Sequence, residues 1–230
     1  MAKDKKQAQP DTVESLDNAL TKSEQFIEQN QKSLTIIIVA ILVIVSIYFG
    51  YKRFYLAPME KEAQSQIFVA QFNFEKDSFK LALNGNDNNL GFIQVADKYS
   101  MTKTGNLAYY YAGICYRQLG EYQKAIECLK KFDAGDLLVT PVAYGAIGDC
   151  YVELSQLKEG AKYYEKAANY SEDEFTTPIF LKKAGMVYEE LKQNDKALKL
   201  YNQIKDSYPK SAEARDIEKD IARINTILGK

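Results

Sequence analysis

The chain has 230 residues, of which 46% are hydrophobic and 27% charged, and its formal net charge is −1. This composition predicts a folded protein of one or two domains, and the near-neutral charge argues against nucleic acid as a ligand. The chain contains no histidine, which excludes histidine-dependent catalytic triads and removes the commonest transition-metal ligand. We therefore expect no catalytic residues, no metal, no cofactor and no small-molecule substrate.

The N-terminal tail, residues 1–33, changes character along its length. Its first fifteen residues are polar, and we expect them to be disordered. Ser15 to Lys32 carries apolar residues at helical spacing with acidic residues on another face. This pattern indicates either a short amphipathic helix lying on a membrane or partner, or a helical leader to the next segment.

An uncharged apolar run, LTIIIVAILVIVSIYFGY, occupies residues 34–51, with Lys32 before it and Lys52 and Arg53 after it. Eighteen helical residues span about 27 Å, close to the thickness of a bilayer core. We predict a transmembrane helix over residues 34–53. The run is longer than the apolar part of a secretory signal, and no small-x-small cleavage site follows. Lysine and arginine counts on the two sides do not decide its orientation.

Residues 58–104 predict a degenerate pair of helices. Pro58 is suited to the first turn of a helix that we expect to run to about Leu83, where Asn84–Asp87 stops it. A second helix is expected within LGFIQVADKYS, residues 90–100. Its spacing of large residues matches a segment near the C-terminus; the two sets are Phe92, Val95 and Tyr99, and Tyr201, Ile204 and Tyr208.

Residues 105–208 contain three near-copies of one phrase, GICYRQLGEYQKA, GDCYVELSQLKEG and GMVYEELKQNDKA, whose first glycines are 35 and 37 residues apart. Those glycines are Gly113, Gly148 and Gly185. A tyrosine follows each glycine by three residues and a small residue by twelve; these are Tyr116, Tyr151 and Tyr188, and Ala125, Gly160 and Ala197. We predict paired helices over 105–119 and 121–133, 140–154 and 157–169, and 177–192 and 194–207. Turns are expected at Gly120, Ser155 and Gln193–Asp195, and the first glycines are expected where helices cross.

The last predicted element is a capping helix within residues 209–230. After Pro209, four apolar residues share one side and charged residues occupy the others; the apolar four are Ile217, Ile221, Ile224 and Leu228. A helix with a polar outer face closes a stack of repeats.

The cysteines Cys115, Cys128 and Cys150 lack the spacing of a metal or redox motif. We expect buried free thiols, with a disulfide or redox role as the alternative.

The repeated phrase resembles the tetratricopeptide repeat, whose unit alternates large, small and tyrosine positions across two helices. The resemblance implies an all-α, right-handed solenoid and a partner-binding groove lined by fixed positions of each first helix. Those positions give Tyr110, Ile114, Arg117, Asp149, Val152, Glu153, Lys182, Met186 and Glu189. The lysine and asparagine clamp with which some members grip a peptide carboxylate is absent. A groove with apolar side chains suits an extended or helical polypeptide; alternatively, some of these residues pack the solenoid itself.

The order of parts resembles the YfgM family of bacterial inner-membrane proteins, although these repeats are more regular and richer in tyrosine. The resemblance implies a cytoplasmic N-terminus, a periplasmic repeat domain, and translocon subunits, periplasmic chaperones or exported polypeptides as partners. Alternatives are a structural assembly factor of an envelope-biogenesis complex, and the inverted topology with cytoplasmic repeats. An enzyme is not expected, because adjacent carboxylates such as Glu189 and Glu190 point apart on a helix and are typical of solvated surface charge.

Overall fold

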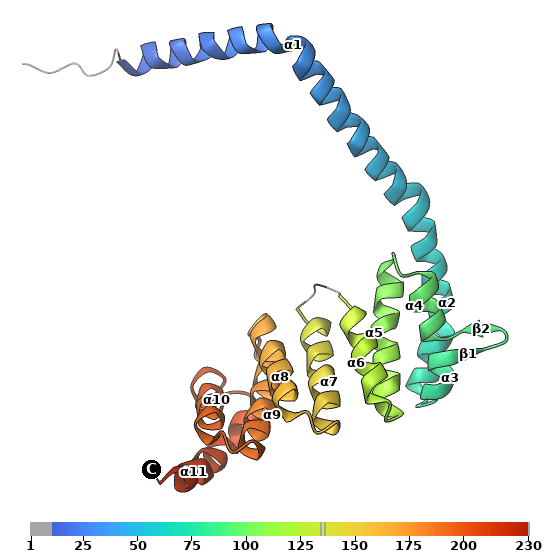
Figure 1. The fold of residues 1–230 in the computed structure, drawn as a ribbon, viewed down its shortest axis with the longest axis vertical. Coiled ribbons are helices and arrows are strands. Elements are labelled where there is room, and N and C mark those ends of the chain that lie inside the picture. The colour runs from blue at the N-terminus through green and yellow to red at the C-terminus, as the bar shows by residue number, and fades with distance from the viewer. Residues whose placement is uncertain (1–10, 134, 136, 230) are drawn as a thin grey trace, which may run out of the picture. The chain divides into compact units, whose positions relative to one another are not determined.

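The structure is a computed structural model that describes residues 11–133, 135 and 137–229, with side chains described from Phe26 onward. The described chain is mainly helical (Figure 1) and divides into two units, Met1–Tyr55 and Leu56–Lys230. Each unit is described separately below.

The described part of the first unit contains helix α1, Asp11–Tyr51, and all but the last residue of a π-helical turn, η1, Lys52–Leu56. The disorder expected for residues 1–15 is wrong for residues 11–15, which are helical, while residues 1–10 lie outside the described part. The predicted leader and the apolar run form one uninterrupted helix, because neither glycine nor proline separates them. Within the helical stretch Phe26–Glu75, an apolar window has a mean hydropathy of 2.7 and none of it is buried. This helix is long and apolar enough to cross a membrane.

The second unit begins with the degenerate pair, in which α2, Ala57–Glu75, is followed by the short α3, Phe79–Asn84. The expectation of one helix to Leu83 is therefore wrong. Asp77 adopts a left-handed conformation with φ of 54°, and the Ser78 amide donates to the Asn73 carbonyl at 2.9 Å. This hydrogen-bond pattern closes a helix C-terminus, and aspartate tolerates the left-handed conformation it requires.

A two-stranded hairpin that the sequence did not predict joins α3 to α4. Strand β1, Gly85–Asn86, pairs antiparallel with β2, Asn89–Leu90. The Asn86 side chain holds the turn, because its Oδ1 accepts from the amides of Asn88 and Asn89 at 3.0 and 2.9 Å. The second helix of the pair, α4, then spans Phe92–Lys98 and packs on α5.

Three regular helix pairs follow, as predicted, and Figure 1 shows them stacked side by side. They are α5, Lys103–Gln118, with α6, Tyr122–Lys131; α7, Val139–Glu153, with α8, Leu157–Ser171; and α9, Thr176–Glu190, with α10, Asn194–Ser207. Each helix packs on the next along the chain, which makes the array a solenoid.

The turns inside the three pairs have one geometry. The residue seven positions after each first glycine has a positive φ: Gly120 at 78°, Ser155 at 58° and Lys192 at 58°. The third turn therefore precedes its predicted place at Gln193–Asp195, because Asn194 and Asp195 belong to the first turn of α10.

The three repeat glycines lie at helix crossings, as predicted. A Cβ atom at Gly113 would be 2.5 Å from Leu129 Cγ, and one at Gly148 would be 2.7 Å from Tyr164 Cδ1. At Gly185 it would be 2.4 Å from Tyr201 Cε1. These separations are well inside van der Waals contact, so the glycines allow each second helix to approach its first helix closely.

The C-terminal cap is a helix, α11, over Ile217–Leu228, preceded by a 3₁₀ turn, η2, at Glu213–Arg215. Ile217 and Ile224 are fully buried in the last core cluster, and α11 packs on α10.

The three cysteines are free; Cys115 and Cys150 are fully buried, whereas Cys128 is partly exposed. Burial raises the pKa of Cys115 to about 12 and that of Cys150 to about 11, so both thiols are protonated at neutral pH.

Candidate functional site

The candidate site lies on the first helices of the three pairs, α5, α7 and α9, which contact one another along the stack. Residues one and four positions after each glycine share one face of their helix. That face carries Ile114 and Arg117 on α5, Asp149 and Val152 on α7, and Met186 and Glu189 on α9. All six are residues that the sequence assigned to the groove.

Seven of the nine predicted groove residues line two surface hollows. The first hollow has a volume of about 280 Å³ and includes Arg117, Asp149, Val152 and Glu153 together with Gln118, Tyr122 and Tyr164. The second has a volume of about 480 Å³ and includes Lys182, Met186 and Glu189 together with Asp216, Lys219, Asp220 and Arg223 of the capping region. We call these the α7 hollow and the α9 hollow.

The other two predicted residues, Tyr110 and Ile114, pack the solenoid. The Tyr110 ring lies 5.4 Å from that of Phe132 and 5.6 Å from that of Tyr111, measured between centroids. Ile114 is only 8% exposed. Tyr110 is thus partly buried against the core cluster that contains Phe132.

Asp149 is the centre of a polar network in the α7 hollow. Its Oδ2 pairs with Arg117 Nη1 of α5 at 2.6 Å, and its Oδ1 pairs with Lys183 Nζ of α9 at 2.7 Å. The Tyr164 hydroxyl of α8 also donates to Oδ1 at 2.7 Å. One carboxylate thus ties together the first helices of all three repeats. Burial, and then the Asp149 charge, raise the pKa of Tyr164, so this hydroxyl stays protonated and donates to the carboxylate.

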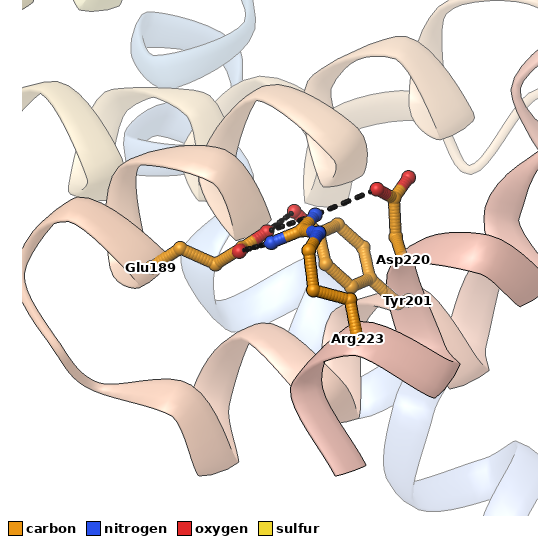
Figure 2. A network of polar contacts seen from close by, with 4 residues as sticks. All are labelled: Glu189, Tyr201, Asp220 and Arg223. Carbon is orange, nitrogen blue, oxygen red and sulfur yellow. Dashed lines mark hydrogen bonds and ion pairs between the residues drawn. The ribbon is translucent and has the colours of Figure 1, made fainter. Parts of the chain in front are cut away.

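A second network, drawn in Figure 2, joins the last repeat to the cap. The Tyr201 hydroxyl donates to Glu189 Oε1 at 2.5 Å. Arg223 of α11 pairs with both oxygens of Glu189 and donates to Asp220 Oδ1 at 2.7 Å. Burial alone would raise the pKa of Glu189, but the hydrogen bonds from Arg223 and Tyr201 lower it, so the carboxylate is ionised.

The two networks use one tyrosine position and two carboxylate positions. Tyr164 and Tyr201 both lie sixteen residues after their glycine, whereas Asp149 follows its glycine by one residue and Glu189 by four. One helical turn separates those carboxylate positions, and each tyrosine reaches the carboxylate available in its own pair. The recurrence of tyrosine at this position in two copies is the sequence feature from which the networks could have been predicted. No comparable repeat marked Lys183 and Arg223, the other partners that sequence reasoning missed.

The α9 hollow also contains an exposed apolar side chain. Met186 is 59% exposed, and it lies among lysine, arginine, aspartate and glutamate residues. In the α7 hollow, Val152 is partly buried, because it packs against Gly160, where a Cβ atom would be 2.7 Å from Val152 Cγ2. Among the described residues, no cluster of histidine, cysteine, aspartate or glutamate has an arrangement that would hold a metal ion.

Comparisons with known proteins agree with this architecture. Models of the tetratricopeptide repeat match residues 107–133, 141–174 and 183–211. These segments are tetratricopeptide repeats. No curated protein matches the sequence.

Among solved structures, the chain is similar to the repeats of a protein from Podospora anserina described as a kinesin light chain with TPR-like repeats. The identity is 14%, the TM-score is 0.55, and the match covers 74% of this chain and 88% of that one. These values are for a single-residue variant of that protein, and the unsubstituted protein gives the same values. At this identity the likeness shows a shared fold alone.

Proposed function

We propose that this protein is a membrane-anchored scaffold whose α7 and α9 hollows bind polypeptide. Tetratricopeptide repeats are protein-interaction modules, because stacked repeats present an extended surface. The observation that carries the proposal is the exposed Met186 in a hollow whose charged neighbours are largely paired. Methionine is flexible and polarisable, and it suits contact with varied apolar side chains.

The charges around the α9 hollow indicate which polypeptides it favours. Its lining has three cationic and three anionic side chains, namely Lys182, Lys219 and Arg223, and Glu189, Asp216 and Asp220. Lys219 pairs with Asp216 at 2.5 Å, and Arg223 pairs with Glu189 and Asp220. Because these charges balance, a strongly charged peptide gains little here, and a segment with apolar side chains gains most.

The apolar segment of α1 determines where the proposed scaffold is located. We propose that residues 34–53 cross the bilayer once, which raises the effective concentration of the repeats near other membrane proteins. The resemblance to the YfgM family supports a bacterial inner-membrane location with a cytoplasmic N-terminus and periplasmic repeats. It also supports translocon subunits, periplasmic chaperones or exported polypeptides as partners. A reporter fused after Lys230 that is active only in the cytoplasm would contradict this orientation.

A structural assembly factor is the second candidate, favoured by the two polar networks. Asp149 links three repeats and Glu189 links the last repeat to the cap, which predicts a rigid groove. A rigid site suits one stable partner better than many transient ones. A single stoichiometric partner that remains bound through purification would favour this function over binding of exported chains.

Two exposed methionines allow a matched test of groove binding. The full chain in detergent micelles is titrated with a fluorescent, reduced and alkylated polypeptide, and anisotropy is measured. Met186→Asp is expected to weaken binding about tenfold, because it places a charge at the apolar contact. Met101→Asp, at a residue 63% exposed outside both hollows, is the control and is expected to bind like the wild type. Equal binding by both variants would overturn the proposal.

A further inference from the structure

Away from the groove, three tyrosines of the second repeat form a surface cluster with one lysine of the same repeat and one lysine of the first repeat. The rings of Tyr151 and Tyr163 lie 5.4 Å apart, and that of Tyr144 lies 6.4 Å from Tyr163. Lys166 Nζ is 3.9 Å from the centre of the Tyr144 ring, and Lys130 Nζ donates to the Tyr151 hydroxyl at 2.8 Å. Tilted tyrosine rings with lysine ammonium groups over their faces fill this part of the repeat.

The third repeat keeps one member of this cluster and replaces the other four. Counted from the first glycine, Tyr144, Tyr151 and Tyr163 correspond to Leu181, Tyr188 and Leu200. By the same count, Lys166 corresponds to Gln203, and Lys130 of the first repeat corresponds to Glu165 of the second. The structure supports this alignment, because Lys130 and Glu165 contact the corresponding tyrosines, Tyr151 and Tyr188.

These replacements leave a hollow of about 360 Å³ where the second repeat has two phenol rings. Its floor is Leu181, Tyr188 and Leu200, each at most 8% exposed. Its rim consists of polar and charged side chains: Glu165, Asn169, Lys196, Lys199 and Gln203. We call it the α10 hollow. On α9, its residues lie on average about 120° around the helix axis from Met186 and Glu189, so it opens on a different face from the groove.

The charge at the rim is asymmetric. Lys196 and Lys199 are exposed, and Lys196 Nζ lies 4.9 Å from the centre of the Tyr188 ring. Glu165, the sole carboxylate in the lining, is hydrogen-bonded to the Tyr188 hydroxyl; burial, and then this carboxylate, raise the pKa of Tyr188 to about 12. The apolar floor therefore has two lysines beside it and one engaged acid.

We propose that the α10 hollow binds an aromatic side chain of a protein partner, presented by an acidic segment. The second repeat shows within this same chain that tyrosine rings fill the corresponding space. The partner's ring would lie on Leu181 and Leu200, and carboxylates next to it would meet Lys196 and Lys199. This is a second protein-binding site, independent of the groove.

The probes that test it are three capped tripeptides, acetyl-Asp-Tyr-Asp-amide, acetyl-Asp-Ala-Asp-amide and acetyl-Lys-Tyr-Lys-amide. The full chain in detergent micelles, labelled with ¹³C at leucine and methionine methyl groups, is titrated and followed by NMR. The acidic tyrosine peptide is expected to shift the methyl signals of Leu181 and Leu200 saturably and to leave that of Met186 unchanged. The alanine peptide is expected to cause no saturable shift, and the basic peptide to bind at least tenfold more weakly.

Two variants make the test decisive. Leu181→Tyr with Leu200→Tyr and Gln203→Lys restores the residues of the second repeat at these three positions and is expected to abolish binding. If that variant does not fold by circular dichroism, the charge reversal of exposed Lys196 and Lys199 to glutamate is expected to weaken the acidic peptide at least tenfold. The proposal would be overturned if a folded variant bound the acidic peptide as the wild type does, or if the peptide shifted only the Met186 methyl signal. It would also be overturned if the Leu181 and Leu200 signals moved with protein concentration and not with peptide. The Met186 signal also separates failure here from failure of the groove.

Discussion

Replacing Gly185 with alanine tests the close helix packing on which the solenoid depends. In an exposed helix, alanine is favoured over glycine by about 1 kcal/mol. Here the new Cβ would lie 2.4 Å from Tyr201 Cε1 and 2.9 Å from Cζ. The ring is fully buried, and its hydroxyl is held by Glu189 at 2.5 Å, so it has no free space to enter. Overpacking costs about 1–3 kcal/mol, and disturbing a charged hydrogen bond costs about 1.5–3 kcal/mol.

The expected net effect is a loss of about 2 kcal/mol in the free energy of unfolding, since the packing and hydrogen-bond costs exceed the gain in helix propensity. Urea denaturation of the full chain in micelles, followed by circular dichroism, measures it. Ala222→Gly, at an exposed position of α11, is the control and is expected to show the propensity effect alone. Tyr201→Leu combined with Gly185→Ala is expected to couple by at least about 1 kcal/mol. A Gly185→Ala chain more stable than the wild type would refute the packing argument.

Three further predictions follow from the described contacts. Asp149→Ala is expected to lower the free energy of unfolding by about 2 kcal/mol, because it leaves two cations and a hydroxyl without their acceptor. A loss below about 0.5 kcal/mol in urea denaturation would contradict the role of Asp149 as the acceptor that links the three repeats. Ser155→Gly and Lys192→Gly are each expected to stabilise by about 0.5–1 kcal/mol, since both residues have a φ of 58°, and calorimetry showing a lower melting temperature would oppose this. Burial raises the pKa values of Cys115 and Cys150 from about 9 in the unfolded chain to about 12 and about 11 in the folded chain. The free energy of unfolding is therefore expected to be unaffected by the ionisation of these thiols below pH 9 and to fall as the pH rises from 9 to 12, because the unfolded chain loses their protons first. Denaturation midpoints across that range, and slow reaction with a thiol reagent at pH 8, check it.

The sequence was sufficient for the parts of the fold that repeat. Gly113, Gly148 and Gly185 recur with tyrosines and small residues at fixed offsets, and that pattern predicted the helix pairs and their crossings. The break between α2 and α3 was not predictable in this way, because Asp77 lies in a segment with neither glycine nor proline. The third inner turn was misplaced for a similar reason, since Lys192 adopts a conformation that is unusual for lysine.

The candidate site was predictable by position but not by contact. Counting along each first helix placed Arg117, Asp149 and Glu189 on the groove face, and the structure puts them in the two hollows. Their partners were missed, because Lys183 and Arg223 each reach a carboxylate 34 residues away. The contact of Tyr110 with Phe132 was likewise not predicted, because it joins residues 22 positions apart.

In vivo photocrosslinking from the groove tests the central claim most directly. A photoreactive residue is placed at Met186 in the α9 hollow, and a matched one at exposed Lys166 of α8, outside the groove. Adducts are identified by mass spectrometry. We expect translocon subunits, periplasmic chaperones or exported polypeptides to be crosslinked from position 186 and not from 166. Equal recovery of the same proteins from both positions, or none from 186, would contradict a polypeptide-binding groove.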